Sequence, residues 1–488
     1  MALQSTGKII SAGYGTYNNS ISFLIIRYNE NGSIDSSFGN EGVTGNFNDL
    51  NQVNGLAIQK DDAIIAVGHT SDVKLVRYKK DGTLDSSFGN EGIVITNVGA
   101  EDVPADVAIQ PDGKIVVCGY IINDANEARQ LFLVRYLDNG SLDGSFGENG
   151  IVILGETNGD KSLSTVNALA LQPNGQILIC AYLVKGAIYR FNIDGSVDKT
   201  FGINGLAYFQ AKDNLVKNFQ AYDIVVQSDN KIVGGGTSPK SDNSGNNYMA
   251  AGRLNADGSI DSSFGNNGLQ HVLFGNNPSE GRSILLEKEG KLIVSGTTHD
   301  DTYTYSNLAL TRFNSMGFID STFGNNGQTE TEAGGSASGK SSVLQNDGKI
   351  LLGGTLNTGA IGGNNYFLLA RYNNNNDTKK QIIITKIRHW IQHHNGIEWY
   401  NMPDIQSYAV QRSTDGQHWV TISNQAAVSG QQFAVNHYSD PTPSSNETTY
   451  YRLHTTSTSN AVANSNVIAI SNDDDIKVSP ILHKAYCI

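Results

Sequence analysis

One eight-residue pattern recurs six times along the chain and constrains its fold more than any other feature. The pattern reads DSSFGNEG at 35–42 and again at 85–92. It returns with small changes at 143–150, 198–205, 261–268 and 320–327. Its phenylalanines are spaced by 50, 58, 55, 63 and 59 residues. They are Phe38, Phe88, Phe146, Phe201, Phe264 and Phe323. A period of this length is typical of tandem units that each bury one face against the next unit.

A second signature precedes each unit's pattern and occurs seven times. It reads LQSTGKII at 3–10, IQPDGKIV at 109–116 and LQNDGKIL at 344–351. Around it, short runs of Val, Ile and Leu are bounded by Gly, Asn and Asp, which favours strands over helices. The copy at 51–98 divides into four strands, NGLAIQ (a), AIIAVGH (b), VKLVRY (c) and GIVITNV (d). Seven such units predict an all-β fold, a seven-bladed β-propeller, with an extended β-solenoid as the alternative.

The connections between strands carry turn residues. The segment PDG at 111–113 suits a tight turn between strands a and b, with glycine at positive φ. In the c–d connection, Gly32 is expected at positive φ and Asp35 is expected to accept hydrogen bonds from nearby backbone amides. We expect Phe38 to fill the gap between neighbouring sheets. Many of the 53 glycines therefore mark repeat boundaries.

An arginine stands eight residues before each motif aspartate. This spacing predicts a structural clamp in which the guanidinium holds the c–d loop carboxylate. A functional binding ring is the alternative, but function normally breaks repeat symmetry. The clamp residues are Arg27 with Asp35, Arg77 with Asp85, Arg135 with Asp143, Arg190 with Asp198, Arg253 with Asp261, Arg312 with Asp320, and a seventh arginine, Arg371, that has no motif after it.

Antiparallel blades place the a–b and c–d turns on one side of the disc and the b–c and d–a loops on the other. The near-invariant motifs are all a–b or c–d turns, and we call their side the uniform face. The other side, the varied face, carries irregular segments such as 14–20, 122–129, 238–247, 299–306 and 356–365. Variable loops on a rigid scaffold commonly bind ligands. The candidate binding residues there, suited to stacking on and hydrogen bonding to a sugar, are Tyr14, Tyr17, Asp300, Asp301, Tyr303 and Tyr305.

Catalytic and metal-binding signatures are weak. The Asn- and Asp-rich c–d loops offer side-chain oxygens that could hold calcium, although their spacing is not that of an EF-hand. His389 and His393 have helical zinc-site spacing, but they lie in a predicted strand region without a third ligand. We therefore expect no cofactor, with calcium as a minor alternative, and assign no catalytic residue. The sequence has no G-x-S-x-G motif and no P-loop.

Composition narrows the possible partners. The net charge of −13 argues against a nucleic-acid binder, and no apolar run is long enough to span a membrane. Cys118, Cys180 and Cys487 are too few for a disulfide framework, and the first two are expected as small core residues.

The motif pair Q-x-D-G-K-I and R-Y-N-x-D-G-S-φ-D-x-x-F-G-x-x-G resembles the delta-sixty repeat, a β-propeller family of unknown function, over residues 1–373. The resemblance implies a secreted or surface-exposed bacterial propeller and carries over no catalytic residues. Relatives open with a strand that this chain lacks, and the seventh unit ends at RYNNNND without its own motif. We therefore expect a ring that lacks one closing outer strand, and an N-terminus that has lost any signal peptide.

The repeats give way to a different composition after residue 375. We predict a propeller at 1–375, a linker at 376–380, a fibronectin-like β-sandwich at 381–472 and a tail at 473–488. The sandwich prediction rests on alternating apolar and polar residues. VQRSTDGQHWVTI at 410–422 resembles the module before the sorting signal of type IX secretion system cargo, and IKVSP at 476–480 is similar to an incomplete start of that signal.

These features favour a non-enzymatic binding or adhesion module, extracellular or at the cell surface, with carbohydrate or a surface protein as its partner. A secreted polysaccharide hydrolase or lyase is the first alternative and a structural spacer is the second. The ligand and the oligomeric state do not follow from the sequence.

Overall fold

The computed structural model describes most of the repeat region and part of the C-terminal region. The described residues are 1–17, 20–45, 53–123, 128–154, 163–183, 185–209, 218–241, 246–300, 304–333, 335–357, 365–374, 380–385, 396–400, 405–415, 417–426, 435–439, 449–457, 462–464 and 468–470. Among them, no helix is long and apolar enough to cross a membrane.

Seven four-stranded antiparallel sheets follow one another along the chain. The first four are β1 (Ala2–Leu3), β2 (Ile9–Tyr17), β3 (Ser20–Tyr28) and β4 (Val43–Thr44); β5 (Val53–Ile58), β6 (Ile64–His69), β7 (Val73–Tyr78) and β8 (Ile93–Thr96); β9 (Glu101–Ile109), β10 (Ile115–Asn123), β11 (Ala128–Tyr136) and β12 (Ile151–Leu154); and β13 (Thr165–Leu171), β14 (Ile177–Tyr182), β15 (Gly186–Phe191) and β16 (Leu206–Tyr208). The last three are β17 (Gln220–Val226), β18 (Ile232–Pro239), β19 (Asn247–Leu254) and β20 (Leu269–Val272); β21 (Ser279–Leu286), β22 (Leu292–His299), β23 (Ser306–Phe313) and β24 (Gln328–Thr331); and β25 (Ser336–Leu344), β26 (Ile350–Asn357), β27 (Asn365–Tyr372) and β28 (Lys380–Thr385).

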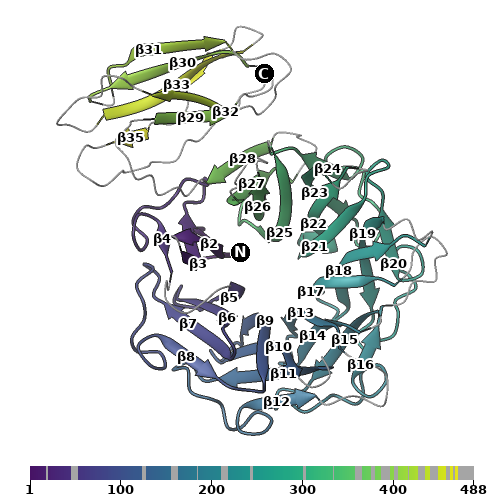
Figure 1. The fold of residues 1–488 in the computed structure, drawn as a ribbon. Coiled ribbons are helices and arrows are strands. Elements are labelled where there is room, and N and C mark those ends of the chain that lie inside the picture. The colour runs from purple at the N-terminus through teal and green to yellow at the C-terminus, as the bar shows by residue number, and fades with distance from the viewer. Residues whose placement is uncertain are drawn as a thin grey trace.

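The seven sheets form the blades of a ring (Figure 1). The first strand of each blade lies nearest the centre and the fourth lies at the outer edge (Figure 1). The one short 3-10 helix among the described residues, Lys288–Gly290, lies in the a–b turn of the sixth blade. The fold of the repeats is therefore the predicted all-β propeller, with one blade for each copy of the repeat.

The motif phenylalanines are buried where neighbouring blades meet. Phe38 packs against Ile25 of its own blade and Ile64 of the next, and its side chain is inaccessible to solvent. Phe88 repeats this arrangement between the second and third blades. Burying a phenylalanine stabilises the fold by about 1.5–3 kcal/mol. The six motif copies therefore contribute to holding the blades together.

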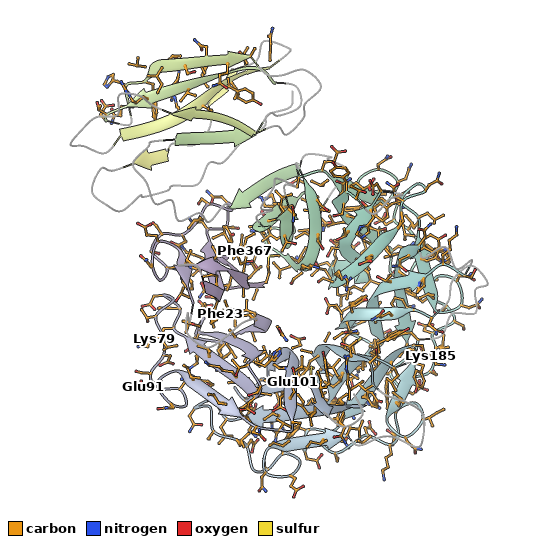
Figure 2. The ribbon with its side chains drawn as sticks, in the orientation of Figure 1. Phe23, Lys79, Glu91, Glu101, Lys185 and Phe367 are labelled. Atoms are coloured by element: carbon orange, nitrogen blue, oxygen red, sulfur yellow. The ribbon has the colours of Figure 1, made fainter. Side chains whose placement is uncertain are left out.

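The first and last blades complete the ring, and here the structure corrects the sequence. We expected an open outer position in the seventh blade, but β28 pairs with β27 from Phe367 to Tyr372 and supplies a fourth strand. This strand lies beyond residue 375, where we placed the end of the propeller. Phe367 lies next to the first blade, in the same part of the ring as Phe23 (Figure 2).

Several segments expected to be loops are extensions of hairpins. β2 and β3 pair from Ile9 and Tyr28 out to Tyr17 and Ser20, so Tyr14 and Tyr17 lie in a strand and not in a loop. β10 and β11 likewise pair out to Asn123 and Ala128. Cross-strand hydrogen bonds thus continue where the polar sequence had indicated irregular backbone.

After the propeller, the described strands form two further antiparallel sheets. One contains β29 (Gly396–Tyr400) and β32 (Val435–Ser439). The other contains β30 (Ile405–Ser413), β31 (Val420–Ala426), β33 (Thr449–Ser457), β34 (Val462–Asn464) and β35 (Ile468–Ile470). In the second sheet, Arg452 stacks on Trp419 at 4.3 Å.

Candidate binding site at the inner strands

The innermost strand of six blades carries a β-bulge at the same place. The register slips by one residue between Val53 and Gly55 in β5, and the equivalent slip recurs in β9, β13, β17, β21 and β25. The six extra residues are Asn54, Ala105, Asn167, Tyr222, Arg282 and Lys340. Bulges of this kind change the direction of a side chain and are over-represented next to functional sites.

Five of the six bulge residues fall into two groups. In the second and fourth blades they tie neighbouring blades together, because Asn54 donates to the carbonyl of Pro104 at 2.6 Å and Asn167 to that of Ala221 at 2.7 Å. In the fifth, sixth and seventh blades the same position holds a tyrosine, an arginine and a lysine. Repeat symmetry is therefore broken on three consecutive inner strands.

Arg282 is the centre of this group. Its guanidinium lies over the ring of Tyr222 at 4.2 Å and forms an ion pair with Glu280 at 2.6 Å. The other carboxylate oxygen of Glu280 lies 4.0 Å from Nε2 of His299, at the end of β22. Glu280 is the second residue of β21 and His299 is the last residue of β22, so both lie toward the varied face. We call Tyr222, Glu280, Arg282, His299 and Lys340 the axial cluster.

Charge and burial shift the titration of the cluster. Burial and the charge of Arg282 lower the pKa of Lys340, although the lysine is exposed to solvent. Burial likewise lowers the pKa of His299 and raises the pKa of Tyr222. An exposed lysine that still feels burial is surrounded by protein on several sides. The other members of the cluster are half-buried and Lys340 is exposed, so the cluster is open to water.

Two aspartates lie one position after a bulge on the inner strands. Asp223 accepts hydrogen bonds from the backbone amide of Ile284 at 2.9 Å and the hydroxyl of Ser283 at 3.0 Å. Asp106 accepts one from the amide of Leu169 at 2.9 Å. Burial raises the pKa of Asp223 and raises that of Asp106 to about 7. Their carboxylates thus link neighbouring inner strands.

The candidate residues from the varied loops are placed apart from one another. Tyr14 and Tyr17 belong to the hairpin of the first blade. Asp300 and Tyr305 belong to the sixth blade, where the carboxylate of Asp300 accepts a hydrogen bond from the amide of Thr304 at 2.7 Å and Tyr305 is 66% exposed. Asp301 and Tyr303 lie outside the described residues, as do His389 and His393.

Each motif arginine contacts its motif aspartate. The six Nε–Oδ2 distances lie between 2.7 and 3.0 Å, from Arg27–Asp35 in the first blade to Arg312–Asp320 in the sixth. Each guanidinium also stacks on the motif phenylalanine of its own blade at 4.3–5.0 Å. The guanidinium therefore binds the loop and covers the buried ring at once.

The same arginines reach the following blade. Arg77 donates to the carbonyl of Asp138 at 2.6 Å, Arg253 to that of Ser315 at 2.7 Å, and equivalent bonds leave the other motif arginines. Burial alone would raise the pKa of Asp261, but hydrogen bonds from Ser263 and Lys231, together with the charge of Arg253, lower it to about 2. The clamp thus ties neighbouring blades together around the ring.

Metal-ligating side chains do not gather in the part of the chain that the structure describes. No group of three or more His, Cys, Asp or Glu residues there is arranged to hold a metal ion. The turn aspartates make hydrogen bonds within their own turns, as where Asp81 accepts from the amide of Thr83 at 2.9 Å and from its hydroxyl at 2.7 Å. Cys118 and Cys180 are buried free thiols.

Sequence reasoning missed the axial cluster because a bulge leaves no motif. The extra residue becomes visible only when strand partners are known. One signal was present in the sequence. When the inner strands are aligned, the position of the extra residue changes from Asn54, Ala105 and Asn167 in the second to fourth blades to Tyr222, Arg282 and Lys340 in the fifth to seventh.

Comparison with known proteins gives a family and distant similarities of fold. A search among curated proteins found no significant match. Among solved structures, the Dos1 propeller is 11% identical with a TM-score of 0.42, covering 78% of this chain and 87% of its own. A gluconolactonase from Xanthomonas campestris is 12% identical with a TM-score of 0.35, covering 70% and 92%. The PQQ-bound aldose sugar dehydrogenase from Streptomyces coelicolor is 12% identical with a TM-score of 0.37, covering 65% and 93%.

These structural similarities are too weak to bear on function. The family model is the informative match. It is described as a domain of unknown function (DUF5122) β-propeller, and it matches residues 4–38, 59–88, 110–146, 172–201, 227–264, 289–323 and 345–376, one segment in each blade. The chain therefore carries seven repeats of the DUF5122 β-propeller family.

Proposed function

We propose that this chain is a non-enzymatic binding or adhesion module that takes its ligand on the varied face of the propeller. One observation carries the proposal. The uniform face repeats the same turns and clamps from blade to blade, whereas the inner strands break the repeat at Tyr222, Arg282 and Lys340. The bulge residues of the second and fourth blades bond to the next blade, and those of the last three blades are larger or charged, which favours recognition of a ligand there.

The axial cluster is suited to holding a polar ligand. Arg282 is fixed between the ring of Tyr222 and the carboxylate of Glu280, so little side-chain entropy is lost when a ligand binds it. The exposed Tyr305 and the turn at Asp300 belong to the same blade as Arg282. Aromatic rings and fixed polar groups are typical of carbohydrate recognition, and carbohydrate is the ligand class that we propose.

A polysaccharide hydrolase or lyase is less well supported. Glycosidases need two carboxyl groups that flank the scissile bond, with one of them kept protonated. The axial cluster has a single carboxylate, Glu280, and that carboxylate forms an ion pair with Arg282 at 2.6 Å. The spacer alternative predicts no ligand at all.

The location of the protein is also a proposal. The delta-sixty resemblance and the likeness of residues 410–422 to a type IX secretion module favour a protein outside the cell or at its surface. The two sheets formed by β29–β35 are compatible with the predicted fibronectin-like sandwich, which would present the propeller to its ligand.

An array of glycans and matrix proteins tests the binding function. We expect the wild-type chain to bind one glycan class, and Arg282→Gln and Tyr305→Ala to weaken that binding. Phe318→Ala is the matched control, because Phe318 is an aromatic residue 48% exposed in a turn of the uniform face. Binding lost equally in Phe318→Ala would refute the choice of face. No binding to any glycan or protein would refute the binding function, and turnover of a bound polysaccharide would favour the enzyme.

A further inference from the structure

The three symmetry-breaking bulge residues supply two cations and one aromatic ring in adjacent blades. Arg282 is the bulge residue of β21 and Lys340 that of β25, and the charge of Arg282 is felt at Lys340. Bringing two cations together without a counter-ion costs free energy. An anion placed between two cations at a water-accessible position relieves that cost.

One of the two cations already has a partner. Glu280 pairs with Arg282 at 2.6 Å. For Lys340, by contrast, no hydrogen bond or ion pair is found with any other described residue. The ammonium of Lys340 is thus exposed, and the carboxylate of Glu280 acts on it only through its charge, without direct contact, while the planar edge of Arg282 is held in place by Tyr222. This arrangement suits one carboxylate placed between the lysine and the arginine.

The remaining groups suit hydroxyls. Glu280 offers carboxylate oxygens as acceptors, and the half-buried ring of His299 lies 4.0 Å from one of them and is itself a polar group. A sugar ring presents several hydroxyls that both donate and accept. The cluster therefore combines a site for one negative charge with partners for uncharged polar groups.

We propose that the axial cluster binds a uronic acid residue of a glycan, with the sugar carboxylate between Lys340 and Arg282. This inference rests on the proposed binding function and specifies its ligand class. A densely charged polyanion fits less well, because the chain's net charge of −13 repels it at long range. A single carboxylate among hydroxyls matches the one net positive charge that Arg282, Lys340 and Glu280 carry together.

Titration calorimetry with matched oligosaccharides tests the proposal. The probes are trimers of galacturonic, glucuronic and mannuronic acid, each compared with its methyl ester, which keeps the shape and removes the charge. We expect the full chain to bind at least one acid trimer about tenfold more tightly than its ester, as a charge-assisted hydrogen bond would give. Lys340→Gln should remove that difference, because it weakens binding of the acid more than binding of the ester.

Lys79→Gln is the matched control. Lys79 is an exposed lysine in the c–d connection of the second blade, on the uniform face and at the outer edge of the ring (Figure 2). We expect this variant to bind like the wild type, and neither variant to melt below the wild-type temperature, because both lysines are exposed.

The outcomes separate this inference from the proposed function. Equal affinity for acid and ester, or binding of neutral glycans alone, would overturn the uronate proposal while the binding function stands. Loss of acid selectivity in Lys79→Gln would also overturn it. Failure to bind any glycan or protein on the array would overturn both.

Discussion

Arg371 of the seventh blade donates a hydrogen bond to the backbone carbonyl of Glu30 in the first blade at 3.1 Å. Gln345 donates to the same carbonyl at 3.1 Å. Arg371 is thus the seventh member of the arginine column, and it makes the bond to the next blade although it has no motif aspartate of its own. The column therefore joins all seven blades, and its last bond closes the ring.

The clamp of the second blade should be the most sensitive to loss of its arginine. When Arg253 is removed, Asp261 of the fifth blade keeps its ion pair with Lys231 at 3.0 Å. The second blade has no such lysine, because Ala63 stands at the equivalent position. Arg77→Gln therefore leaves a largely buried carboxylate without a cation and should cost about 3 kcal/mol of unfolding free energy. Arg253→Gln should cost about 2 kcal/mol. Urea denaturation of both variants measures the difference, and equal losses would contradict it.

Gly82 should tolerate no side chain. It has φ +87°, and a Cβ there would lie 2.8 Å from the backbone nitrogen of Gly39 and 2.8 Å from the ring of Phe38. Gly113 has φ +89° but has no atom within 4 Å of such a Cβ. Gly113→Ala should cost about 1 kcal/mol from backbone strain alone. Gly82→Ala should cost clearly more, since it also separates two blades. Thermal unfolding of the pair tests this, and similar melting temperatures would show that the contact can relax.

The clamp carboxylates should make the propeller sensitive to acid. Burial opposes ionisation of Asp35, but hydrogen bonds from Lys8 and Ser37, with the charge of Arg27, lower its pKa to about 2. An unfolded aspartate has a pKa of about 3.9, so the unfolded chain binds more protons between pH 4 and pH 2. This contribution to stability is complete above about pH 4 and is lost as the pH falls to 2. Urea denaturation across this range should show the decline, and Asp35→Asn should make it shallower.

Removal of divalent cations should leave the melting temperature unchanged. The c–d turn oxygens that could have bound calcium accept hydrogen bonds from their own turn, as Asp81 does from Thr83. A bound cation would have to compete with these bonds. Thermal unfolding with EDTA, and again after calcium is restored, measures the effect. A rise in melting temperature on adding calcium would point to a site that uses other oxygens.

The blades could be predicted from the sequence because each unit repeats residues with a local task. Gly32 was expected at positive φ and has φ +88°, and the spacing of Arg27 and Asp35 matches their contact. The outer strand β28 could not be predicted, because KQIIIT follows an Asn-rich segment and lacks the glycine motif of other fourth strands. Its partner is set by the space left beside β27. The axial cluster was missed for a related reason: its residues come from three consecutive blades and meet only when the inner strands pack side by side.

Asp106 should give the propeller a second pH dependence, opposite in sign to that of the clamp. Burial raises its pKa to about 7, although the amides of Leu169 and Val107 donate to its carboxylate. An unfolded aspartate has a pKa of about 3.9, so between pH 4 and pH 7 the folded chain binds more protons than the unfolded chain. This contribution to stability is therefore complete below about pH 4 and is lost as the pH rises through 7. The unfolding free energy should therefore decline between pH 4 and pH 7. Asp106→Asn should flatten that decline in urea denaturation, while the control Asp112→Asn, in an exposed turn, should leave it unchanged. A decline that persists in Asp106→Asn would assign the effect to another group. Asp223 is then the first to examine, because burial raises its pKa as well.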